Sequence, residues 1–144
     1  MNISKINSFS PNFKAVSKSA AQAAIEAERE KCGDDASKFC AGLDNIETLV
    51  ENQKDNKRYN VIAVDARICG QRYPFAVVAH NGILVEGKMP DGTQRAYSAY
   101  HKTLEGACMA ATSCDMEDAA YEEKTQEKLK EANEKIASIL DMCI

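Results

Sequence analysis

The chain has 144 residues, of which 44% are hydrophobic and 28% are charged, and its formal net charge is −4. This length is enough for one domain with its own hydrophobic core. The excess of negative charge lies in residues 101–144, which carry five basic and ten acidic side chains; this balance argues against nucleic acid as a partner. The longest apolar run, residues 75–79, is far too short to cross a bilayer, so we expect no membrane partner.

The six cysteines do not form a metal-binding pattern. No two of them are spaced as CxxC, and only two histidines are present, so we predict no metal site and no cofactor. Residues 1–16 lack the apolar stretch of a secretory signal. We therefore predict a cytoplasmic protein with reduced thiols, most of them buried as small apolar side chains; in an exported protein the even count would instead allow disulfides. The cysteines are Cys32, Cys40, Cys69, Cys108, Cys114 and Cys143.

The N-terminal part predicts a tail and two helices. Residues 1–16 are rich in Ser and Asn and show no period, which indicates a flexible tail before a single α+β domain at 17–144. Residues 17–32 are an alanine-rich helix that ends at Gly33. A second helix begins after Asp34 or Asp35 and runs to about residue 56. Its apolar residues recur at spacings of four, three and four: Phe39, Leu43, Ile46 and Val50.

Residues 59–98 predict a meander of four antiparallel strands. The apolar stretches are 59–68, 72–80, 83–89 and 93–98. Asn81-Gly82 fits a two-residue type I′ turn, and Pro90-Asp91-Gly92 fits a type I turn closed by a left-handed glycine. Gly70-Gln71 is a weaker candidate for the first turn.

These turns fix which side chains share a face of the predicted sheet. They place Val78 opposite Val85, Gly87 opposite Arg95 and Asp65 opposite Ala76. Both faces are too apolar to meet water, so we expect helices of the chain or a second copy to cover them.

One row of this sheet is a candidate ligand site. Asp65 and Arg95 stand at the ends of a trough whose floor is formed by two small residues, Ala76 and Gly87. His80 and Tyr97 lie nearby. Such a trough can hold a small polar or anionic ligand against Arg95. The alternative is structural: Asp65 and Arg95 are edge charges that prevent strand aggregation, and Gly87 lets a helix approach.

Two further helices are predicted at the C-terminal end. Ser98 caps the first, and Ser113 or Asp115 begins the second. The last helix has an apolar seam over about two heptads, which is shorter than a stable coiled coil requires. Its seam residues are Leu129, Ala132, Ile136, Ile139 and Cys143.

No pattern specifies a catalytic chemistry, and we assign no catalytic residue. A cysteine nucleophile with His80 or His101 as its base has no supporting motif, and the seven glycines form no phosphate-binding loop. The order of helix, strands and alanine-rich helix is similar to that of double-stranded-RNA-binding domains. The basic cluster of those domains is reduced here to His101-Lys102, and we assign no family.

The sequence therefore predicts an α+β domain with two helices, a four-strand antiparallel meander and two helices. We expect a non-catalytic module for protein-protein interaction or self-assembly, with a homo-oligomer or a protein partner. The alternative is a small-ligand-binding protein that uses Asp65, His80, Arg95 and Tyr97. An enzyme with a Cys/His pair is the third and weakest hypothesis.

Overall fold

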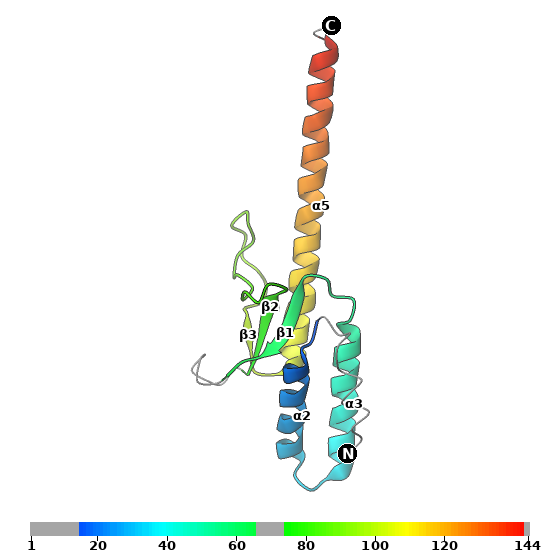
Figure 1. The fold of residues 1–144 in the computed structure, drawn as a ribbon, viewed down its shortest axis with the longest axis vertical. Coiled ribbons are helices and arrows are strands. Elements are labelled where there is room, and N and C mark those ends of the chain that lie inside the picture. Colours follow the sequence, from blue (N-terminus) through cyan, green and yellow to red (C-terminus); the bar gives the residue numbers. More distant parts are fainter. Residues whose placement is uncertain (1–14, 66–73, 143–144) are drawn as a thin grey trace.

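The computed structural model describes residues 15–65 and 74–142. The fold of these residues is α+β, as predicted, with three helices and one antiparallel sheet of three strands. Helix α5 rises from the level of the sheet to the C-terminal end of the molecule, the sheet lies beside its N-terminal half, and α2 and α3 extend in the opposite direction (Figure 1). The elements are α2 (Lys18–Cys32), α3 (Ala36–Asn52), β1 (Tyr59–Ala63), β2 (Phe75–Ala79), β3 (Tyr100–His101) and α5 (Leu104–Met142).

The first two helices are confirmed. The Ser17 hydroxyl accepts a hydrogen bond from the Ala20 N–H and caps α2, and the Asp35 carboxylate caps α3 through the Lys38 N–H. These caps satisfy backbone donors that a helix leaves unpaired at its start. The helices lie side by side, with the Arg29 guanidinium 4.5 Å from the centre of the Phe39 ring.

Most of the predicted tail, residues 1–14, lies outside the described residues. Ala15 and Val16, its last two residues, are buried. The Ala15 carbonyl accepts a hydrogen bond from the Val61 N–H, at 2.6 Å. These two residues therefore belong to the folded domain, where they cover the outer edge of β1.

The predicted four-strand meander is wrong in its second half. Its first two strands form β1 and β2, and Tyr100–His101 completes the sheet beside β2. In residues 83–98 only two isolated bridges are found, Val78 with Leu84 and Lys88 with Gln94. The run Glu86-Gly87-Lys88 offers no apolar side chain to bury, and glycine weakens a strand, so this segment forms an irregular hairpin beside α5.

The turn at Asn81-Gly82 has one more residue than predicted. The Gly82 N–H donates to the Ala79 carbonyl, the φ of Gly82 is 84°, and Ala79 N–H bonds the Ile83 carbonyl. The loop therefore spans residues 80–82, with a left-handed glycine in third place. A slip of one residue exchanges the faces of a strand, and Val85 consequently joins Val77 in the core.

The pairing of β1 with β2 also differs from the prediction. Ala63 pairs with Phe75, and Ile62 pairs with Ala76, so Asp65 does not lie opposite Ala76. The candidate turn at Gly70-Gln71 lies outside the described residues. The predicted trough between Asp65 and Arg95 is therefore not formed as a single row.

The turn at Pro90-Asp91-Gly92 is confirmed. The Gly92 N–H donates to the Met89 carbonyl, and the φ of Gly92 is 87°. The Arg95 N–H donates to the Gly87 carbonyl at 2.9 Å, which is the predicted pairing. Proline at the second position and glycine at the fourth suit a type I turn, so the local sequence is sufficient to predict this turn.

The two predicted C-terminal helices are one continuous helix, α5. It begins after Thr103, whose hydroxyl accepts the Gly106 N–H. Ser113 lies inside the helix, where its hydroxyl bonds the Glu117 carboxylate, and Asp115 binds Arg58 instead of capping. Because residues 107–142 contain no proline or glycine, nothing interrupts the backbone hydrogen bonds. The 39 residues span about 60 Å.

The core lies where α5 crosses the sheet. Small side chains of α5 pack on Val61 of β1 and Val77 of β2, both fully buried, and α2 covers the lower end. The residues that α5 buries are Leu104, Ala107, Cys108, Ala110, Ala111 and Cys114. Within the described ranges, no helix combines the length and apolar content that a bilayer crossing needs.

Candidate functional site

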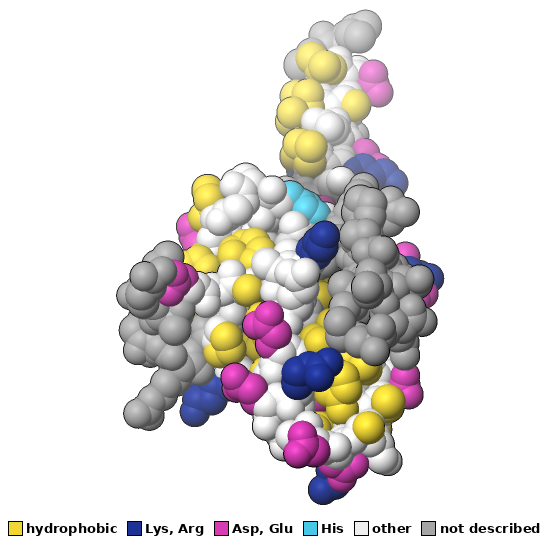
Figure 2. Space-filling model, turned by 60° about the horizontal axis from the view of Figure 1, so that its bottom comes forward, with side chains coloured by type: hydrophobic (Ala, Val, Ile, Leu, Met, Phe, Trp, Pro, Cys, Tyr) yellow, Lys and Arg dark blue, Asp and Glu magenta, His cyan; other side chains and the backbone are white. Residues whose placement is uncertain are grey.

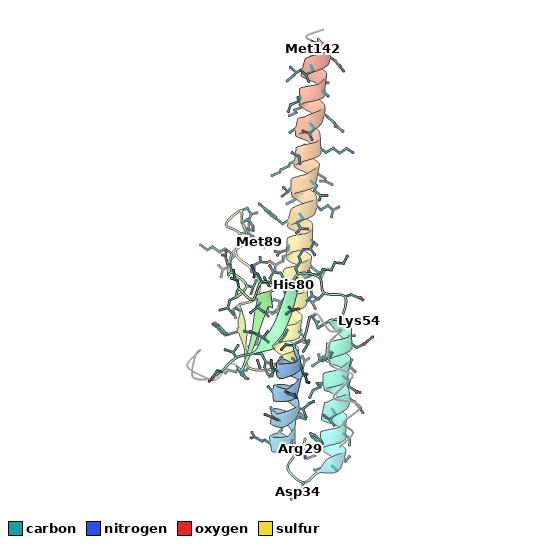
Figure 3. The ribbon with its side chains drawn as sticks, viewed as in Figure 1. Arg29, Asp34, Lys54, His80, Met89 and Met142 are labelled. Carbon is teal, nitrogen blue, oxygen red and sulfur yellow. The ribbon has the colours of Figure 1, made fainter. Side chains whose placement is uncertain are left out.

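The last part of α5 projects away from the rest of the molecule. We call residues 123–142 the arm, and the remaining described residues the head. Every side chain of the arm is exposed, and no other described element runs beside it up to Met142 (Figure 3). Its large apolar side chains are each more than half exposed: Leu129 61%, Ile136 56%, Ile139 59%, Leu140 60% and Met142 85%.

These exposed residues form a stripe, not a scatter. Leu129, Ala132, Ile136 and Ile139 follow one another at spacings of three and four, and Leu140 lies beside them. Hydrophobic side chains gather along one side of the arm in Figure 2, and charged ones lie on the other. The arm is therefore an amphipathic helix whose apolar side meets no part of the described chain. We call these five residues the apolar stripe.

The apolar stripe lies on the same side of α5 as the residues that the head buries. At 3.6 residues per turn, the mean directions of the two sets differ by only about 10°. One face of α5 therefore runs from the sheet, where it is covered, into the arm, where it is not.

Between the two apolar sections this face carries acids. Asp115, Asp118 and Glu122, which we call the polar belt, receive the basic side chains of the head. The Arg58 guanidinium donates to the Asp115 carboxylate at 3.1 Å and to the Glu122 carboxylate at 2.7 Å. These hydrogen bonds raise the pKa of Arg58 and lower the pKa of Glu122.

Arg95 is the second cation of the polar belt and is almost buried. Its side chain is 6% exposed and pairs with Asp118 at 2.9 Å. It also donates to the Tyr59 hydroxyl at 3.2 Å, and that hydroxyl donates in turn to Asp118. Burial, and then the bond to Asp118, raise the pKa of Tyr59. Among the described residues, Nε and Nη1 of Arg95 have no hydrogen-bond partner.

The four predicted ligand-binding residues do not come together. Arg95 lies in the polar belt, and Tyr97 is 37% exposed on the irregular hairpin. His80 bonds the Lys57 carbonyl through Nε2 and Asn60 through Nδ1, next to the end of β1 where Tyr59 lies. Asp65 is exposed beyond the opposite end of β1. The register of β1 and β2 separates Asp65 from the other three.

A cleft does exist beside Arg95, between the hairpin and α5. Its volume is about 490 Å³, within the usual range for small-molecule pockets. Of the four predicted residues, only Arg95 lines it. Lys88, Glu86 and Tyr121 bring mixed charge and an aromatic ring to the same walls.

The two buried cysteines of α5 are not activated. Burial raises the pKa of the Cys108 thiol to about 12. Burial also raises the pKa of Cys114, although the neighbouring Arg95 acts in the opposite direction. A nucleophilic cysteine needs a lowered pKa, so neither thiol is suited to that role. Within residues 15–65 and 74–142, no three His, Cys, Asp or Glu side chains are placed to hold a metal ion.

Sequence reasoning missed the polar belt, although a signal was present. Counting back in sevens from Leu129 gives Glu122 and Asp115, and from Ala132 gives Thr125 and Asp118. Acids at seam positions of a helix are unusual unless cations of the same chain meet them. The predicted helix start at Ser113 or Asp115 hid the continuity of this face with the helix before it.

Comparison of the chain with protein-family models, with characterised proteins and with solved structures gives no match.

Proposed function

We propose that this protein is a non-catalytic assembly module that binds a second copy of itself through the apolar stripe of the arm. The observation that carries the proposal is the exposure of that stripe along its whole length. Single exposed apolar residues are common on protein surfaces, but a contiguous row on an amphipathic helix is typical of a binding face. The polar belt fixes the base of the arm, so the stripe is presented on a rigid element.

The energetics agree with a weak, reversible contact. Burying one exposed Leu or Ile contributes up to roughly 1–2 kcal/mol, and part of the total is lost to the entropy of association. For a two-heptad seam we expect a dissociation constant on the order of 100 µM.

The charges of the arm favour a protein partner over an anionic membrane. Residues 123–142 contain four lysines and five acidic residues, so the polar side has no net positive charge. Helices that bind anionic lipid surfaces carry an excess of Lys and Arg on that side. The seam spacing is the one by which helices pair with each other, and a second copy always offers the same spacing.

The proposal is tested by sedimentation equilibrium between about 10 and 500 µM, a range that brackets the expected constant. We expect the average mass to rise from that of a monomer toward that of a dimer. Ile136→Glu places a charge in the stripe and should keep the chain monomeric. Ala137→Glu, one residue along on the outer side, is the matched control and should associate like the parent. A parent chain that stays monomeric throughout the range contradicts the proposal.

A second candidate function is binding of a small polar or anionic ligand in the cleft beside Arg95. The volume of the cleft and the buried Arg95 with its unpaired donors support it. Thermal unfolding with inorganic phosphate, citrate and ATP tests it. We expect at least one probe to raise the melting temperature, and Lys88→Ala, at the mouth of the cleft, to reduce that shift. No shift with any of the three removes this candidate.

We further propose that the protein works in the cytoplasm with reduced thiols. Cys32, Cys40, Cys108 and Cys114 are free in the structure, which suits a reducing compartment. Rapid alkylation of cell extracts, followed by mass analysis, should find all six cysteines alkylated. Recovery of any of them as a disulfide contradicts this part of the proposal.

A further inference from the structure

We infer that the two arms pair antiparallel, so that the heads lie at opposite ends of the dimer and each arm reaches back toward the hairpin of the other copy. This inference deepens the proposed function and rests on it. It follows from the fact that the apolar stripe and the buried face of α5 share one side of the helix.

A parallel dimer in register is blocked by the heads. The sheet and the hairpin stand on the side of α5 that, further along, carries the apolar stripe. In a parallel pair both sheets would have to fit between the two helices, which pack only about 8–10 Å apart. Each sheet layer alone needs about 10 Å. From Leu129 back to Glu122 the helix rises only about 10 Å, which is too short for a continuous helix to diverge that far.

The antiparallel arrangement has no such obstacle, because each head lies beyond the tip of the other arm. The small Ala132 then meets the partner's Ile136, and Leu129 meets the partner's Ile139. Twofold symmetry repeats both contacts, which gives four layers of apolar side chains. In a parallel pair Ala132 would meet its own copy and leave a thin layer, whereas the antiparallel pairing sets small against large in the way that close packing requires.

The length of the arm fits this register. In it the partner's Met142 comes level with Gln126, about half a turn above Lys124. The hairpin tip lies close to Lys124, whose charge acts on the Asp91 carboxylate. The described part of the partner's arm therefore lies along the uncovered part of the face.

Cysteine cross-linking distinguishes the two orientations. Leu129→Cys and Ile139→Cys are made separately, each with Cys143→Ser, because Cys143 continues the seam in sequence. In the antiparallel dimer, residues 129 and 139 of different copies are opposite. Each residue is about 15 Å from its own counterpart, and a disulfide needs Cα atoms within about 7 Å.

We expect a disulfide-linked dimer after mild oxidation of the two variants mixed together, and none above the Cys143→Ser background from either variant alone. Cross-linking of Ile139→Cys with itself indicates a parallel dimer and overturns the inference. Sedimentation of the variants and of the parent chain distinguishes failure of the proposed self-association from failure of the antiparallel orientation alone. Loss of all association in the parent contradicts the proposed function, whereas a dimer with the wrong cross-links contradicts only its orientation.

A charge removal provides a second measurement that does not alter the stripe. In the antiparallel register the partner's Lys135 comes level with residue 133, only about 3 Å along the helix from Lys135, whereas a parallel pair puts Lys135 beside Leu140. Lys135→Gln therefore removes a repulsion, and we expect the dimer to tighten about twofold at low salt. Lys130→Gln, on the outer side, is the matched control and should change little. Unchanged or weaker association of Lys135→Gln also overturns the inference.

Discussion

The two halves of α5 have the same apolar spacing and opposite environments. In the head the seam consists mainly of alanine and cysteine, and these side chains are buried against the sheet. In the arm the seam consists mainly of leucine and isoleucine, and they are exposed. Small side chains let the sheet approach the helix closely, whereas large ones suit a second helix that inserts its own side chains between them. The spacing of the apolar residues thus identifies which face of a helix is suited to burial. The size of those side chains indicates whether a sheet or another helix fits against that face.

The polar belt marks the boundary between the two halves. Arg58 reaches α5 from the loop just before β1, and Arg95 reaches it from the hairpin. They bind acids at positions that a continuous seam would fill with apolar residues. This contact holds the base of the arm against the head. It also occupies this face of α5 as far as residue 122.

The largest effect is expected where this boundary is broken. Arg95→Ala leaves Asp118 and the Tyr59 hydroxyl without their nearly buried cation, and we expect a loss of about 3 kcal/mol in the free energy of unfolding. Denaturant titration measures it. The double variant Arg95→Ala/Asp118→Ala should recover part of the loss, because the unpaired carboxylate is gone. A change as small as that of Lys130→Ala in the arm, about 0.5 kcal/mol or less, contradicts the role given to Arg95.

A smaller effect is expected from one substitution made in both halves. Ala111→Leu adds volume at a fully buried position of the head and should cost about 2 kcal/mol of stability. Ala132→Leu makes the same change in the arm, where the side chain stays exposed and should leave the unfolding of the dilute monomer unaltered. Thermal unfolding of both variants at low protein concentration tests the contrast. Equal destabilisation by the two changes contradicts the division of α5 into a covered half and an exposed half.

The smallest effect is a pH dependence that belongs to the head alone. The pKa of Tyr59 is raised above its ordinary value of 10.0, so the folded state holds the phenol proton more tightly than the unfolded state does. This contribution to stability is complete below pH 10 and is lost as the pH rises toward the folded pKa. Denaturant titrations at neutral and alkaline pH should show the loss, and Tyr59→Phe should reduce it. An alkaline loss of the same size in Tyr59→Phe contradicts the assignment to this residue.

Some features of the fold could be predicted from the local sequence, and others could not. The end of α2 at Gly33, the start of α3 after Asp34 or Asp35 and the turn at Pro90-Asp91-Gly92 were predicted correctly, because their hydrogen bonds join residues within four positions of each other. The turn at Asn81-Gly82 was predicted in the right place but with the wrong length. Type I′ turns and three-residue loops both accept Asn-Gly, and the burial of Val85 beside Val77 decides between them.

The candidate ligand site shows how errors in turn length add up when positions are counted across several turns. Asp65 and Arg95 were placed in one row by counting residues across three turns. One of those turns lies outside the described residues, and another is a residue longer than predicted. Of the proposed group, only Arg95 lines the cleft, and its partners Tyr59 and Asp118 come from a strand and a helix distant in sequence. Pairs of this kind cannot be found from spacing along one strand.

The sequence by itself determined the helical periodicity, the caps, two of the strands and the apolar seam near the C-terminus. These features depend on hydrogen bonds and side-chain spacing within a few turns of chain. Only the tertiary structure decided that α5 is continuous, that its acids bind Arg58 and Arg95, and that the sheet covers just the first half of its apolar face. Each of these depends on contacts between residues far apart in sequence, and the free energy of such a contact is set by burial and by the charge it meets.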